Sequence, residues 1–214
     1  MISLIKRDLK LNFATKASVI FLIIFLPFLM LIMEINDIER IYPFMILSYG
    51  YILTSMPFRY DAREKADLLI QSLPIKKRDV VISKYISALI NYLIALSYTW
   101  FVLSILDLIK LGIGVNLNLT IIKETVFVFI LVSSISLPAY LRLPPKLAGV
   151  VNVIIFVIIL NIFVFMPGDK DITNIINIFG EFSNNGFFAI AILGIIYLLS
   201  MGISIFLYET RDLY

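Results

Sequence analysis

The sequence contains no cysteine and no histidine among its 214 residues. Without cysteine, the chain has no disulfides, thiolate nucleophiles or cysteine metal ligands. Without histidine, it also lacks imidazole acid–base catalysis, imidazole proton relays and the usual zinc ligands. We therefore expect no catalytic, cofactor-binding or metal-binding residues in this chain.

Charged residues are also scarce. Only 15% of the residues are charged, whereas 61% are hydrophobic, and a soluble domain is about a quarter charged and about half apolar. A water-soluble fold of this size cannot bury so much apolar surface. The composition therefore predicts an all-α integral membrane protein with a single transmembrane domain, residues 1–214.

Enzyme motifs are missing from the sequence as well. It contains no H-E-x-x-H, no G-x-S-x-G and no Walker A pattern, which are the signatures of zinc proteases, serine hydrolases and P-loop ATPases. We also expect no buried carboxylates, because charged residues fall at the ends of the apolar runs. An intramembrane enzyme is therefore disfavoured, and any ATP and Mg²⁺ must bind a separate subunit.

Several apolar runs are long enough to cross a hydrocarbon core of about 30 Å as helices. We interpret the first run as a retained span, because no small-residue cleavage site follows it. The runs predict six transmembrane helices at about residues 17–33, 41–58, 80–106, 121–140, 147–166 and 187–208.

The first residues of the chain have an amphipathic pattern. Ile2, Ile5, Leu9 and Phe13 recur at spacings of three and four, as on one face of a helix. We predict an interfacial helix over residues 1–16 that lies on the membrane surface. A short solvated lead-in to the first span is the alternative.

Positive charges gather on one predicted side of the membrane, which orients the chain. Most of the Lys and Arg residues lie before the first span, between the second and third, and after the fourth. We therefore predict that both termini are cytoplasmic. The largest group follows the second span: Arg59, Arg63, Lys65, Lys76, Lys77, Arg78 and Lys84.

The predicted spans carry uncharged polar residues but no ionisable residue near their centres. This pattern disfavours a transporter driven by protons or sodium ions. Polar residues inside spans usually form interhelical hydrogen bonds, and the alternative is that they line a translocation pathway or a subunit interface. The candidates are Asn91, Ser97, Thr99 and Asn152.

Residues 59–79 contain a second amphipathic pattern. Ala66, Leu69, Ile70 and Leu73 recur at helical spacing, and Pro74 ends the pattern. Opposite charges four positions apart, such as Asp61 and Lys65, would support a helix. Its apolar face requires a partner, which is the lipid surface, the bundle itself or another protein.

Three parts of this region resemble the ABC type-2 transporter permease family of Gram-positive bacteria. They are the run from Arg59-Tyr60-Asp61 through Lys65-Ala66-Asp67-Leu68-Leu69, then Ser72-Leu73-Pro74-Ile75, and then Val80-Val81-x-Ser83-Lys84-Tyr85, which enters the third predicted span. A further match is Leu137-Pro138-Ala139-Tyr140, although Pro144-Pro145 departs from the family's glycine and basic residue. Within the family, the chain looks similar to small six-span permeases such as those of the phenol-soluble modulin exporter.

The resemblance implies a coupling helix that docks on an ABC ATP-binding subunit, which holds ATP and Mg²⁺. The implied docking residues are Asp67, Leu68, Leu69, Ser72, Leu73 and Pro74, with coupling-loop support from Arg59, Asp61, Lys65 and Lys84. It further implies a second permease, in a homodimer or a homologous heterodimer, in the lipid of the bacterial cytoplasmic membrane. We expect export of an amphipathic substrate such as a peptide, and no nucleic-acid partner.

A membrane-embedded binding or immunity protein without a transport cycle is the alternative function. In that case the segment at 59–79 would bind another partner or lipid headgroups. Such a protein would not require an ATPase.

Overall fold

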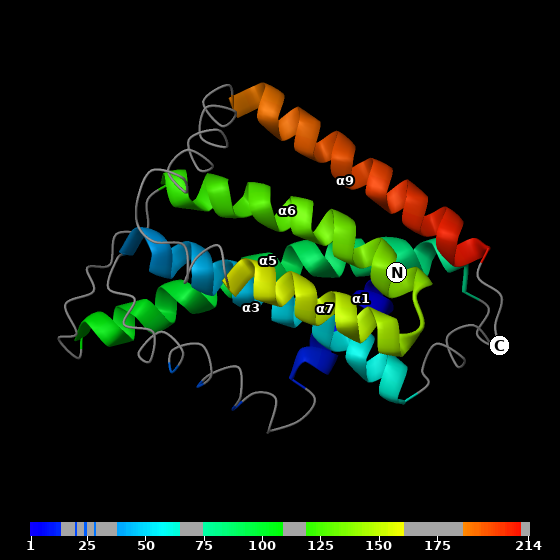
Figure 1. Ribbon diagram of the computed structural model, residues 1–214, viewed down its shortest axis with the longest axis horizontal. Helices are drawn as coiled ribbons and strands as arrows, with labels where there is room; N and C mark the ends of the chain where they lie inside the picture. Colours follow the sequence, from blue (N-terminus) through cyan, green and yellow to red (C-terminus); the bar gives the residue numbers. More distant parts are fainter. Residues whose placement is uncertain are drawn as a thin grey trace.

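The computed structural model describes residues 1–13, 20, 24, 28, 38–64, 75–108, 119–160 and 186–210. These residues form helices, as predicted, which are arranged side by side in a bundle (Figure 1). In chain order the helices are α1 (Ile2–Asn12), α3 (Ile38–Arg63), α5 (Lys77–Leu108), α6 (Leu119–Arg142), α7 (Pro145–Leu160) and α9 (Gly186–Glu209).

Three of these helices contain segments long and apolar enough to cross a membrane, namely Lys77–Ile105, Ile121–Arg142 and Ala191–Glu209. They coincide with the predicted spans at 80–106, 121–140 and 187–208. The shorter apolar helix α7 covers the described part of the predicted span at 147–166. The predicted span at 17–33 lies outside the described residues, apart from the helical positions Ile20, Ile24 and Phe28.

Helix α3 occupies the centre of the bundle. Every side chain from Tyr42 to Pro57 is buried, and the helix packs against α1, α5, α6 and α7. Because this stretch does not face lipid, it tolerates polar residues such as Ser48, Thr54 and Ser55. Over its whole length α3 is less apolar than α6, α7 or α9, mainly because five charged residues lie at its two ends.

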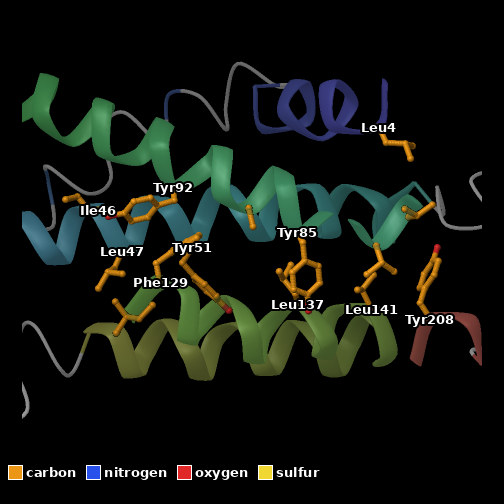
Figure 2. Packing of buried hydrophobic residues seen from close by; sticks show 14 residues of the cluster. Leu4, Ile46, Leu47, Tyr51, Tyr85, Tyr92, Phe129, Leu137, Leu141 and Tyr208 are labelled. Carbon is orange, nitrogen blue, oxygen red and sulfur yellow. The ribbon is translucent and has the colours of Figure 1, made fainter. Parts of the chain in front are cut away.

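The core between α3, α5 and α6 is closely packed (Figure 2). The Tyr92 and Phe129 rings meet with their centroids 4.9 Å apart. A Cβ atom at Gly50 would lie 3.0 Å from the Phe129 ring and 3.8 Å from the Ala95 methyl group. The absence of a side chain at Gly50 therefore allows α3 to approach α6 closely, as small residues do in membrane bundles.

Large apolar side chains cover the outer faces of α5, α7 and α9. Exposed examples are Trp100 and Phe101 on α5, Val153 on α7, and Leu199 and Phe206 on α9. An apolar exterior of this kind is stable in lipid but not in water. The arrangement agrees with the predicted membrane class.

Two boundaries differ from the prediction at the segment 59–79. Helix α3 continues through Arg63, beyond the predicted end at Phe58, and α5 begins at Lys77. The apolar run marks where a helix leaves the hydrocarbon, whereas backbone hydrogen bonds continue past it, as from Glu64 N to Tyr60 O at 2.9 Å. Residues 65–74 lie outside the described residues.

Helix α1 contacts the rest of the bundle through a face other than its predicted apolar stripe. The predicted apolar stripe leaves Ile2 and Phe13 exposed, while the buried face consists of Leu4, Asp8 and Asn12. Sequence periodicity identified the apolar stripe correctly but not the face that contacts the bundle. The bundle contact is largely polar, and its partners lie far away in the sequence.

Candidate functional site

A buried group of charged residues lies where α3 ends and α5 begins. The Lys84 ammonium of α5 donates a hydrogen bond of 2.7 Å to Asp61 Oδ2 of α3 and one of 3.1 Å to Asp8 Oδ1 of α1. The side chains of Lys84, Asp61 and Asp8 are only 5%, 6% and 1% exposed. Three helices are therefore joined through one lysine.

Arg7 completes this group, which we call the charge network (Arg7, Asp8, Asp61 and Lys84). Its Nη2 donates to Asp8 Oδ1 at 2.9 Å and to Asp61 Oδ2 at 3.0 Å. Burial disfavours the charged Arg7 guanidinium, but the attraction of Asp61 and Asp8 outweighs burial and raises its pKa. With two cations and two carboxylates, the network is electrically balanced.

Because the charges of the network are balanced, the loss of any one member is costly. Removing one member of a buried ion pair leaves an uncompensated charge, which costs about 3–5 kcal/mol. Lys84 Nζ also lies 4.6 Å from the centroid of the Phe58 ring, within the range of a cation–π contact. The network therefore resists separation of α1, α3 and α5.

The expectation that buried carboxylates are missing is wrong, since Asp8 and Asp61 are both buried. Asp61 points into the bundle, and its predicted partner Lys65 lies outside the described residues. Both carboxylates are bound by cations. The described residues include no group of three or more Asp or Glu placed to hold a metal ion.

A polar contact continues from the charge network along α1. The Asn12 side-chain amide donates to Asn91 Oδ1 at 2.8 Å, and the Asn91 amide donates to the Leu53 carbonyl at 3.2 Å. Asn91, one of the predicted pathway or interface residues, thus links α1, α3 and α5 in the bundle interior. This geometry matches the interhelical hydrogen bonding favoured for it.

Arg59 belongs to a separate cluster between α3, α6 and α7. The hydrogen-bonding pattern orients the Asn152 amide so that its oxygen accepts from Arg59 Nε at 3.0 Å and also from Arg59 Nη2. The amide nitrogen then donates to the Tyr51 and Tyr140 hydroxyls at 2.8 and 2.9 Å. We call these four residues the Arg59 cluster.

The remaining predicted polar residues take different positions. Ser97 is exposed and donates to the Leu93 carbonyl at 2.9 Å, whereas Thr99 is fully buried. A further polar contact, which sequence reasoning missed, joins α5 and α9. Tyr85 hydrogen-bonds Ser200 and Ser204, each at 2.7 Å, and Ser200 donates to the Ser134 carbonyl of α6 at 2.6 Å.

The predicted coupling residues divide into two groups. The structure brings Asp61 and Lys84 together and places Arg59 in its own cluster. The other residues lie outside the described residues: Lys65, Asp67, Leu68, Leu69, Ser72, Leu73 and Pro74. Sequence reasoning missed Arg7 and Asp8, because Asp8 and Lys84 are 76 positions apart.

Comparison with known proteins identifies a family for this chain. A family model described as "ABC-2 family transporter protein" matches residues 3–209, a range that includes the charge network and the Arg59 cluster. The chain matches no curated protein and no solved structure.

Proposed function

The chain belongs to the ABC-2 family of transporter proteins, and on that premise we propose that it is the permease subunit of an ATP-driven exporter in the bacterial cytoplasmic membrane. ABC-2 permeases are the membrane components of ABC transporters and associate with an ATP-binding subunit. In our proposal that subunit is a separate chain, which binds and hydrolyses ATP with Mg²⁺. Membership of the family favours the permease over a binding or immunity protein without a transport cycle.

One observation supports a coupling role for residues 59–79. The charge network joins the two helices that flank this segment, through the 2.7 Å contact between Asp61 and Lys84. A force on the segment would move α3 and α5 together, because separating a buried ion pair is costly. Asp8 would transmit the same movement to α1.

We propose that residues Asp67 to Pro74 dock on the ATPase as an amphipathic helix in a groove. ATP binding would bring two ATPases together and push the coupling segments toward each other. Two permeases would then change their mutual packing between an inward-open and an outward-open state. In this proposal each permease has six spans with both termini in the cytoplasm.

The second permease is a copy of this chain or a homologue, and membrane lipid surrounds the pair. The apolar outer faces of α5, α7 and α9 offer surface for both contacts. The described interior offers hydroxyl and amide groups and a balanced charge network, which suits an amphipathic substrate such as a peptide better than a small ion. The direction of transport, outward, belongs to the same proposal.

The proposal is tested by purifying the tagged protein from its native membrane in mild detergent and measuring the ATP hydrolysis of what co-purifies. Leu73→Asp places a charge on the apolar face of the proposed coupling helix. Lys76→Asp is the matched control, because it introduces the same residue at an exposed position nearby. We expect an ATP-binding subunit to co-purify with the wild type and the control, and to be lost from Leu73→Asp.

Two results would contradict this proposal. A wild-type preparation free of any ATPase would favour the binding-protein alternative. An ATPase retained equally by Leu73→Asp and the wild type would place the docking contact elsewhere in the chain. Membrane insertion of each variant is checked by its yield and by its elution on size-exclusion chromatography.

A further inference from the structure

Arg59 combines two properties that rarely occur together. The residue is exposed, yet its guanidinium is held by the amide oxygen of Asn152, a residue that is itself buried. Exposed arginines usually keep their rotamer freedom, which costs about 2 kcal/mol to lose. The contact with Asn152 already restricts the rotamers of Arg59 in the folded protein. The guanidinium is therefore preorganised, and binding a ligand costs less of this entropy.

The contacts that orient Arg59 do not neutralise it. Asn152 is an uncharged amide, and the Tyr51 and Tyr140 hydroxyls bind the other end of the same amide. Among the described residues, Arg59 forms no ion pair, whereas Arg63, one turn further along α3, lies 3.6 Å from the Glu64 carboxylate. The Arg59 cluster therefore presents a positive charge with unused hydrogen-bond donors.

The outer face of α7, the helix that carries Asn152, is apolar. This helix exposes valine and isoleucine side chains on both sides of Asn152 in the sequence, including Val150, Val153 and Ile154. Arg59 itself follows directly on the apolar run that ends at Phe58. Arg59 is thus the first charged residue after this apolar run, a position from which basic side chains reach the headgroup level of a membrane.

We propose that the Arg59 cluster and the adjacent face of α7 bind one anionic phospholipid. The guanidinium would receive the headgroup phosphate through paired N–H donors. The acyl chains would lie along the flank of α7 at Val153, the exposed residue next to Asn152. An anionic lipid such as phosphatidylglycerol is preferred over phosphatidylcholine, because choline places a positive charge beside the phosphate that Arg59 binds.

The experiment compares the binding of phosphatidylglycerol and phosphatidylcholine to the purified full-length protein, in detergent, by native mass spectrometry. Arg59→Gln removes the charge but keeps hydrogen-bonding groups. Arg63→Gln is the matched control on the same helix. We expect Arg59→Gln to lower phosphatidylglycerol occupancy about fivefold, the factor that one basic residue contributes at an anionic surface, and Arg63→Gln to leave it unchanged.

A second variant separates the effect of the orientation of Arg59 on lipid binding from the effect of its charge. Asn152→Leu keeps Arg59 but removes the amide that holds it, so phosphatidylglycerol occupancy should fall by less than in Arg59→Gln. A further measurement needs no variant. Phosphatidylglycerol should raise the melting temperature of the wild-type protein more than phosphatidylcholine does. Soluble glycerol phosphate at equal concentration should not displace the lipid, because it lacks the acyl chains.

Several outcomes would overturn the lipid site. Equal binding of the two lipids by the wild type would do so, as would equal losses in Arg59→Gln and Arg63→Gln. Displacement by soluble glycerol phosphate would indicate a phosphate site without lipid selectivity. A change of oligomeric state in Arg59→Gln, with lipid binding intact, would mean that Arg59 faces a carboxylate of a second subunit. None of these readouts depends on an ATPase or on transport.

Discussion

Lys84 Nζ lies 2.7 Å from Asp61 Oδ2, and this buried contact joins the two helices that flank the coupling segment. The same ammonium reaches Asp8 of α1 at 3.1 Å. One side chain therefore connects three helices whose sequences are far apart. The predictions below test this contact and the packing around it.

Replacing Lys84 by methionine should destabilise the protein by about 3 kcal/mol, the lower end of the range for breaking a buried ion pair, because two buried carboxylates would keep only one cation, Arg7. The double variant Lys84→Met with Asp61→Leu should be less destabilised than the sum of the two single variants, since it removes charges of opposite sign together. Unfolding in denaturant, followed by tryptophan fluorescence, measures the difference. Strict additivity would show that the two residues do not interact.

The Asp8→Ala substitution should loosen α1 without unfolding the bundle. It removes the acceptor for Lys84 and Arg7, whereas Asp61 continues to pair both cations. We expect faster proteolytic cleavage near the N-terminus and a loss of stability of about 1–3 kcal/mol, less than for a fully buried pair because the unpaired charge falls on Arg7, which is 30% exposed. Lys10→Ala is the control, because Lys10 is exposed on the same helix. Equal cleavage of the two variants would argue against a role for Asp8 in holding α1.

The Gly50→Ala substitution should be costly at the contact between α3 and α6. The added Cβ would lie 3.0 Å from the Phe129 ring, and overpacking of a core costs about 1–3 kcal/mol. Gly149→Ala is the control on α7, where a Cβ meets nothing within 4 Å. Adding Phe129→Leu to Gly50→Ala should recover part of the melting temperature. An unchanged melting temperature in Gly50→Ala would mean that the ring moves aside freely.

Removing the Tyr85 hydroxyl should weaken the contact between α5 and α9. In Tyr85→Phe the Ser200 and Ser204 hydroxyls lose a shared partner. Interhelical hydrogen bonds in membranes average about 0.6 kcal/mol and reach about 1.7 kcal/mol, so a fall in stability within that range is expected. Ser97→Ala, which removes an exposed hydroxyl, should have no measurable effect. The opposite order of the two effects would refute the assignment.

The limits of sequence reasoning are clearest in α1 and α3. The helical spacing of Ile2, Ile5, Leu9 and Phe13 predicted a helix, and α1 is present. The same spacing could not show that Asp8 and Asn12 face the bundle, because their partners Lys84 and Asn91 belong to α5. The uncharged run of α3 likewise gave no indication that this helix is enclosed by the others.

The sequence by itself determined the class of protein, the positions of its most apolar helices and its membership of the ABC-2 family, which the family match confirmed. These properties depend on neighbouring residues, since hydropathy and motifs are read along the chain. Only the tertiary structure decided that α3 is enclosed, that Asp8, Asp61 and Lys84 meet, and that Asn152 orients Arg59. These features depend on contacts between residues that are distant in the sequence. A charged side chain is stable in a buried site only where the fold brings a partner within hydrogen-bonding distance.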